Sequence, residues 1–242
     1  MPHLYIGTSG YTYKDWRGIF YPKGVAQKNW LAYYASQFEA VEINSTFYRP
    51  FPKHVFEHWR EVTPDSFRFA LKAPKLITHE KALVDVDSAV QEFVANSAGL
   101  GEKLTAMLWP FPSSEHRDTF AERFAQFLPQ LPKSIKHFFE FRHVSWFDDA
   151  IYALLNQHDA GIVINDSTRF PKREVVTDHV MYVRFHGPDQ LYASAYSGYQ
   201  LDNWAQKIGR YTDQEDVYLF FNNTAGGHAL ANAKLMRELL TP

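Results

Sequence analysis

The sequence contains no cysteine among its 242 residues. This absence excludes disulfides, thiolate nucleophiles, zinc–thiolate sites and iron–sulfur clusters, and it is typical of proteins that work in a reducing compartment. No segment approaches the run of about 18 apolar residues that a membrane helix needs, and residues 1–10 lack a basic stretch followed by a long apolar one. We therefore expect a cytoplasmic protein with no membrane partner.

The chain also lacks an excess of charge of either sign. Its formal net charge of -2 provides no basic surface of the kind that displaces counterions from a nucleic-acid duplex. Neither a GxGxxG motif nor a Walker loop occurs, so the usual phosphate-binding signatures of open doubly wound sheets are missing. Hydrophobic residues make up 45% of the chain and aromatic residues 17%, a composition that favours a well-packed globular domain.

Eight short apolar or β-branched segments are spaced too widely to form hairpins. They are Leu4–Gly7, Ala40–Ile43, Phe67–Leu71, Leu104–Trp109, His137–Phe141, Ile162–Asn165, Met181–Phe185 and Val217–Phe221. Segments with helical spacing of apolar positions lie between most of them. The expected helices are Trp30–Phe38, Lys53–Arg60, Ser88–Ala98, Phe120–Leu128, Asp149–Gln157, Leu201–Tyr211 and Ala229–Leu240.

This alternation predicts an α/β fold, a single (β/α)8 TIM-type barrel of parallel strands that occupies residues 1–242 as one domain. The segment 167–178 is polar, contains Pro171 and has no amphipathic face. We therefore expect the sixth crossover to be irregular or a short turn.

Polar residues interrupt the predicted strands near their carboxyl ends. Parallel strands covered on both faces are normally almost continuous apolar runs, because a buried charge loses hydration that its partners must replace. Residues that share a strand face by alternation are Glu42 with Asn44, Arg68 with Lys72, Glu140 with Arg142, and Arg184 with His186; Asp166 and Asn222 end two further strands. Active sites of such barrels lie at the carboxyl ends of the strands, so an anion-binding pocket is expected there.

The residue types favour acid–base chemistry on a small phosphorylated or polyhydroxylated ligand. Glu42, Glu140 and His186 are the candidate catalytic residues, because a carboxyl group among apolar strands can have a raised pKa while one near a cation stays ionised. The candidate substrate-binding residues are Asn44, Tyr48, Lys72, His79, Arg142, Trp146, Asp166, Arg184, Asn222 and Asn223. A hydrolase, a lyase and an isomerase all remain open.

Each pair of opposite charges also has a structural interpretation as a buried ion pair that fixes strand register. A second alternative is a divalent metal held by Glu42, Glu140, Asp166 and His186. The sequence has no HxH or HExxH motif, and the neighbouring cations would compete with a metal. We therefore assign no metal ligands, and no cofactor is clearly implied.

A nucleic-acid or nucleotide-binding barrel, similar to a phosphodiesterase, is the alternative function. Arg49, Lys53 and Lys75 near the rim could follow a phosphate backbone, and rim aromatics could stack on bases. The net charge disfavours this partner relative to a small anionic or sugar-like ligand. A non-catalytic ligand-binding module is the third interpretation.

Several ordered sequence blocks resemble the domain-of-unknown-function family 72, also called the YecE-like family. These blocks include Gly7–Tyr11, Val41–Tyr48, Phe69–Ala73, Glu140–His143, Tyr182–Gly187 and Phe220–Asn223. The resemblance covers essentially the whole chain and implies a TIM-barrel fold without specifying a reaction. The chain departs from the family pattern at Trp109, where a glutamine is usual, and this departure leaves the ligand preference at that edge open.

Overall fold

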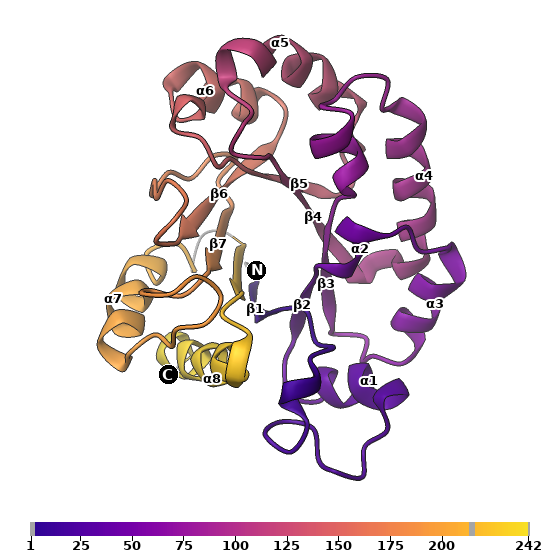
Figure 1. Cartoon of the computed structure of the whole chain (residues 1–242), viewed down its shortest axis with the longest axis vertical. Helices are drawn as coiled ribbons and strands as arrows, with labels where there is room; N and C mark the ends of the chain where they lie inside the picture. Colours follow the sequence, from indigo (N-terminus) through magenta and orange to yellow (C-terminus); the bar gives the residue numbers. More distant parts are fainter. Residues whose placement is uncertain (1–2, 213–215, 242) are drawn as a thin grey trace.

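The computed structural model of the protein describes residues 3–212 and 216–241 and shows a closed barrel of eight parallel strands (Figure 1). The strands follow one another around the barrel in sequence order, and β1 pairs with β8 to close it. Their bounds are β1 Leu4–Ser9, β2 Ala40–Ile43, β3 Arg68–Lys72, β4 Leu104–Pro110, β5 Lys136–Glu140, β6 Ala160–Asp166, β7 Met181–Phe185 and β8 Val217–Phe221. The predicted TIM-type barrel is confirmed.

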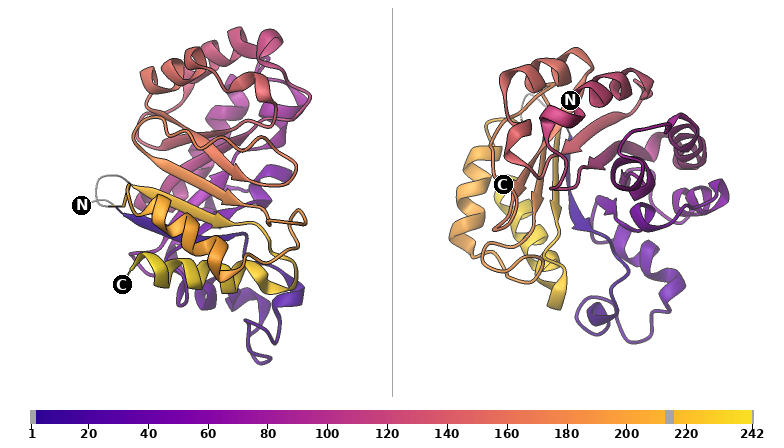
Figure 2. Two further views of the ribbon diagram at one scale, coloured as in Figure 1. Left: turned by 90° about the vertical axis from the view of Figure 1, so that its left-hand side faces the viewer. Right: turned by 45° about the horizontal axis from the view of Figure 1, so that its top comes forward.

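Helices surround the barrel, and the strands all point toward the same end (Figure 2). The helices are α1 Trp30–Ala35, α2 Ser45–Tyr48, α3 Lys53–Glu61, α4 Asp87–Ser97, α5 Arg117–Phe127, α6 Asp149–Gln157, α7 Gly198–Ile208 and α8 His228–Leu240. The sixth crossover, between β6 and β7, contains no helix, as its polar sequence predicts. None of the helices in residues 3–212 and 216–241 is long and apolar enough to cross a membrane.

Alternation along each strand divides the apolar side chains into two layers. Alternate strand residues form a cluster inside the barrel, whereas their neighbours pack outward against the helices. Phe138, Tyr182 and Tyr218 fill the interior, and the two tyrosine rings are stacked with centroids 5.6 Å apart. This aromatic layer closes the barrel below the carboxyl ends of the strands, so the interior is a packed core and not a channel.

Small residues on β1 and β2 allow two strands to approach each other closely. Gly7 pairs with Ala40, and a Cβ atom added to Gly7 would lie 2.0 Å from the backbone oxygen of Ala40. The positions of the added Cβ atom and of the Ala40 oxygen are both fixed by the barrel backbone, so a rotamer change cannot relieve that clash.

We therefore predict that Gly7→Ala lowers the free energy of unfolding by about 1–3 kcal/mol, as for overpacked cores. Urea denaturation of both proteins measures the difference. Gly24→Ala is the matched control, because Gly24 is exposed and an added Cβ there meets no atom within 4 Å. Equal losses in the two variants would show that the close approach of β1 and β2 does not constrain residue size.

Candidate functional site

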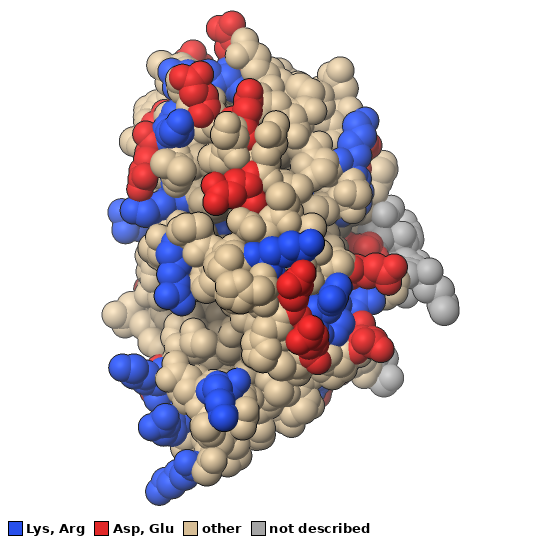
Figure 3. All heavy atoms as spheres, turned by 90° about the vertical axis from the view of Figure 1, so that its right-hand side faces the viewer, with Lys and Arg blue, Asp and Glu red and all other residues tan. Residues whose placement is uncertain are grey.

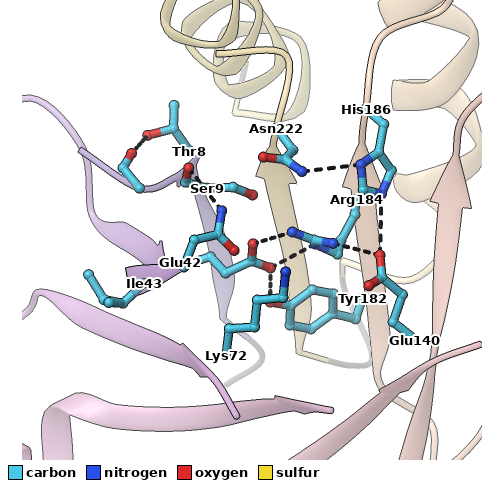
Figure 4. Close-up of polar contacts among 12 residues, drawn as sticks. Thr8, Ser9, Glu42, Ile43, Lys72, Glu140, Tyr182, Arg184, His186 and Asn222 are labelled. Carbon is cyan, nitrogen blue, oxygen red and sulfur yellow. Dashed lines mark hydrogen bonds and ion pairs between the residues drawn. The ribbon is translucent and has the colours of Figure 1, made fainter. Parts of the chain in front are cut away.

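Arg184 on β7 lies between the two predicted catalytic carboxylates (Figure 4). Its Nη2 and Nε atoms donate to Glu42 Oε1 at 2.7 Å and to Glu42 Oε2 at 3.0 Å, and its Nη1 atom donates to Glu140 Oε1 at 2.5 Å. All three side chains are fully buried. One guanidinium group thus joins β2, β5 and β7 across the barrel, through the two-pronged geometry that arginine offers to carboxylates.

Two further buried side chains, Tyr182 and His186, contact the glutamates of this ion group. The Tyr182 hydroxyl donates to Glu42 Oε2 at 2.6 Å. The Nε2 atom of His186 lies 2.9 Å from Asn165 Oδ1 and 3.3 Å from Glu140 Oε1. The Nδ1 atom of the same ring lies 3.2 Å from Asn222 Nδ2 (Figure 4). A neutral imidazole with its proton on Nε2 satisfies these neighbours, since Nδ1 then accepts from the amide.

The environment of the carboxylates keeps them ionised. Burial by itself raises the pKa of Glu42, but the Arg184 guanidinium outweighs burial and the pKa is lowered. For Glu140, burial is likewise outweighed, by Arg142 and Arg184, and the pKa lies well below its usual value. Neither carboxyl group therefore has the raised pKa expected for one of them, and both correspond to the expected ionised carboxyl group beside a cation. Burial lowers the pKa of His186 to about 4, which keeps this ring neutral.

Lys72 is buried, yet its ammonium group forms no hydrogen bond or ion pair with the side chains of residues 3–212 and 216–241. Its Nζ atom lies 4.3 Å from the centroid of the Phe47 ring. Burial lowers the pKa of Lys72 to about 7; repulsion by Arg184 and Arg142 adds to that effect, and attraction by Glu140 and Glu42 opposes it. His79 packs against the same phenylalanine, and the centroids of the His79 and Phe47 rings lie 5.0 Å apart. Burial, then Arg142 and Lys72, lower the pKa of His79 to about 4.

Arg142 and Asn44 carry buried polar atoms that lack a partner. The Nη2 atom of Arg142 donates to Glu140 Oε2 at 2.7 Å and its guanidinium lies over the Phe170 ring, but its buried Nε atom has no acceptor among the described residues. Asn44 donates from Nδ2 to the Ser9 oxygen at 3.2 Å, whereas its buried Oδ1 has no donor there. Native proteins rarely leave such atoms unpaired, so an acceptor at Arg142 Nε and a donor at Asn44 Oδ1, from water or from a ligand, would complete their hydrogen bonding.

We call Glu42, Lys72, Glu140, Arg142, Arg184 and His186 the mouth cluster. All six were predicted to meet at the carboxyl ends of the strands, and the structure brings them together by contact or electrostatic interaction. Among the remaining predicted residues, Asn44, His79 and Asn222 border the cluster.

Asp166 and Asn223 do not join this cluster, contrary to the sequence-based expectation. Asp166 faces α7, where it accepts a hydrogen bond from Trp204 Nε1 at 2.8 Å and pairs with Lys172. Asn223 donates to Asn232 Oδ1 on α8 at 2.9 Å and so ties the loop to a helix. Each occupies the outward position next to an inward asparagine, because successive strand residues point to opposite faces.

The two tryptophans expected at the ligand edge are packing residues instead. Trp146 is fully buried, stacks on Phe141 at 4.5 Å and donates to the Glu115 oxygen, so it offers no free face to a ligand. Trp109 points outward from β4, packs against Phe127 and donates to His137 Nδ1 at 3.0 Å. The departure from the family glutamine therefore lies in the layer between barrel and helices.

Tyr48 is exposed, with 67% of its surface accessible, and it lines a cavity of about 280 Å³. That cavity shares Phe47 with the surroundings of Lys72 but contains no residue of the mouth cluster. Tyr48 thus lies beside the cluster and not within it.

Asn165 and Tyr182 are site residues that the sequence-based prediction missed. Asn165 holds His186, and Tyr182 holds Glu42. Strict alternation would have placed both side chains inside the barrel. Asn165 lies two positions after the inward Val163, and Tyr182 lies two positions before the inward Arg184.

The structure does not support the metal alternative. Within residues 3–212 and 216–241, no group of three or more histidine, aspartate or glutamate side chains is arranged to hold a metal ion. Glu42 and Glu140 direct their oxygens at Arg184, and Asp166 faces away from them. A guanidinium group thus occupies the position that the carboxylates would give to a cation.

The lowered pKa values predict how acid affects stability. Glu140 has a lower pKa in the folded than in the unfolded protein, so its contribution is present above about pH 4.5 and is lost as the pH falls through the folded value. We predict that Glu140→Gln lowers the free energy of unfolding at pH 7 by up to about 3–5 kcal/mol, because Arg184 and Arg142 lose a buried partner.

This variant should also show a flatter decline of stability below pH 4.5 than the wild type. Urea denaturation across the pH range measures both effects. Exposed Glu102 forms no ion pair among the described residues, so Glu102→Gln should behave like wild type. An unchanged stability and pH dependence in Glu140→Gln would contradict the interpretation of Glu140 as an ionised buried partner.

The environment of Lys72 predicts that its removal stabilises the fold. Its folded pKa of about 7 is below the unfolded value, so burial of the amine costs more stability as the pH falls from about 10.5 to 7. Lys72→Met should therefore raise the free energy of unfolding at pH 7 by about 1–4 kcal/mol.

Lys103 provides a matched control with the opposite expected sign. It is as buried as Lys72, but its Nζ atom donates to the oxygens of Arg60 at 2.6 Å and Thr63 at 2.7 Å. Lys103→Met removes these bonds and should destabilise the protein. Chemical denaturation of both variants tests the contrast, and a loss of stability in Lys72→Met would mean that its ammonium group is well satisfied.

Comparisons with known proteins agree with this fold along the whole chain. The family model described as "Protein of unknown function DUF72" matches residues 5–242. UPF0759 protein YunF of Bacillus subtilis is 28% identical, over 98% of this chain and 94% of that protein, and UPF0759 protein YecE of Escherichia coli is 27% identical, over 90% and 86%.

Solved structures give the same result. A DUF72 family protein of Thermotoga maritima superposes with a TM-score of 0.85 at 29% identity and covers 99% of both chains. One from Enterococcus faecalis superposes with a TM-score of 0.84 at 20% identity, over 99% of this chain and 96% of that one, which supports the fold alone. With its family model matched from residue 5 to residue 242, the chain belongs to the DUF72 family.

Proposed function

We propose that the barrel mouth binds a small anionic ligand, phosphorylated or polyhydroxylated, and that its residues carry out acid–base chemistry on that ligand. The observation that carries this proposal is the buried Nε atom of Arg142, which has no acceptor among the described residues. A buried guanidinium N–H costs free energy until an acceptor reaches it, and a phosphate or carboxylate oxygen supplies one.

The balance of charge supports the same ligand class. Lys72, Arg142 and Arg184 supply three cationic groups, whereas Glu42 and Glu140 supply two carboxylates. Both carboxylates already contact Arg184, so they leave Lys72 without a carboxylate partner among the described residues. An anion would neutralise this surplus, and the unpaired Asn44 Oδ1 atom would accept a hydrogen bond from a ligand hydroxyl group.

The geometry also revises the proposed roles. Glu42 and Glu140 act as positioning residues that hold Arg184, because both stay ionised and both are saturated with hydrogen bonds. The side chain that exchanges protons near neutral pH is Lys72, whose pKa is about 7. An acid–base group works best when its pKa is close to the working pH. His186 then acts as a neutral hydrogen-bonding residue beside Glu140.

The nucleic-acid alternative has weaker support. Figure 3 shows acidic and basic side chains interspersed over one face, with lysine and arginine alone only toward its lower end. A continuous basic band of the kind that follows a phosphate backbone is absent from that face. We also propose that the protein acts as one domain in the cytoplasm, in keeping with its lack of cysteine.

Calorimetric titration tests the ligand class. We expect phosphorylated three- to six-carbon sugars to bind more tightly than the same sugars without phosphate, and Arg142→Gln to weaken that binding by roughly tenfold, the effect of losing one charge-assisted hydrogen bond. Arg210→Gln is the control, because Arg210 is exposed and does not border the mouth cluster.

Two results would count against the proposal. One is equal affinity for the phosphorylated and unphosphorylated sugars, and the other is undiminished binding in Arg142→Gln. Tight binding of single-stranded oligonucleotides that falls steeply with salt would favour the nucleic-acid alternative.

A further inference from the structure

We propose that Lys72 is a nucleophile that forms an imine with an aldehyde or ketone ligand in the barrel mouth. The proposal rests on the function proposed above and deepens it, because it names the reactive atom and the substrate class. Its basis is the position of Nζ, which is buried at the carboxyl end of β3 without a carboxylate partner among the described residues.

Several other lysines differ from Lys72 because their Nζ atoms have oxygen partners. Lys136 pairs with Asp178 at 2.7 Å, Lys207 with Glu174 at 2.7 Å, and Lys75 with Glu80 at 2.8 Å. Buried Lys103 donates to backbone oxygens. A lysine must lose its proton before its nitrogen can attack a carbonyl carbon, and a dry site beside other cations favours that loss.

The backbone and ring contacts of Lys72 hold the nitrogen in place. The Thr46 hydroxyl donates to the Lys72 oxygen at 2.6 Å, which fixes the end of β3 to helix α2. The Phe47 ring lies 4.3 Å from Nζ and shields one side of it. Arg184 and Arg142 both act electrostatically on Lys72, so a ligand whose anionic group binds these arginines would bring its carbonyl group into the same region.

The reaction balances without a co-reactant other than a proton. The Nζ lone pair forms a bond to the carbonyl carbon, and one proton moves from nitrogen to the former carbonyl oxygen to give a carbinolamine. The hydroxyl group takes one proton from solvent and leaves as water while the C=N bond forms. The product is a protonated imine, which accepts electron density from a neighbouring C–H or C–C bond. Of the three reaction classes left open, this chemistry selects the lyase and the isomerase.

Reductive trapping tests the proposal on the full chain. The probes are glyceraldehyde 3-phosphate, dihydroxyacetone phosphate, pyruvate and unphosphorylated glyceraldehyde, each with sodium cyanoborohydride, and peptide mass spectrometry locates the adduct. We expect a phosphorylated probe to label Lys72 at least about tenfold faster than Lys75 or Lys136, with a rate that rises with pH to a midpoint near 7.

Variants separate this inference from the function on which it rests. Lys72→Met should lose the preferential adduct, whereas Lys75→Met should keep both the adduct on Lys72 and phosphate-dependent binding in calorimetry. Phosphate-dependent binding by wild type with no preferential adduct on Lys72 from any probe overturns the imine and leaves the anion site standing. If neither phosphate-dependent binding nor a Lys72 adduct appears, both proposals fail. Labelling spread evenly over the lysines also overturns the imine.

Discussion

The contact of one arginine with two glutamates is the interaction on which the site depends. Arg184 binds Glu42 through two nitrogens and Glu140 through a third, with all three side chains buried. Charges removed from water in this way are stable only while each has its partners. The arrangement therefore fixes both the protonation state of the carboxylates and the relative positions of three strands that are far apart in sequence.

This arrangement also determines what the neighbouring groups can do. Because Arg184 uses the carboxylate oxygens, Lys72 is buried beside cations without a counterion of its own among the described residues. The aromatic layer of Phe138, Tyr182 and Tyr218 closes the barrel below and keeps water away from the ions. Burial and repulsion together lower the proton affinity of the amine, at some expense of stability, which is a common feature of functional sites.

Alternation along the strands allowed the barrel and most of the mouth cluster to be predicted from the sequence, because polar residues inside a barrel must occupy every second position near the strand ends. The same rule places Asn165 and Asn222 inside the barrel and their neighbours Asp166 and Asn223 outside it. The prediction relied on polarity alone, so it chose Asp166 instead of Asn165 and included Asn223 together with Asn222. The sequence does not reveal which charged residues pair with each other. Arg184 meets Glu42 from 142 positions away, and only the closure of the barrel decides that contact. Trp146 lies in a loop, where no periodicity reveals that it packs inward.

Arg184 occupies the carboxylates, and for this reason Lys72 remains an unpaired buried amine. Carbon NMR of the lysine Cε resonances over pH 5–11 tests it most directly, with Lys72→Met used to assign the signal. We expect this one resonance to titrate near pH 7. Titration of Lys72 at or above the ordinary lysine pKa of about 10.4 would contradict this interpretation, since that result requires a carboxylate partner that Arg184 has not taken.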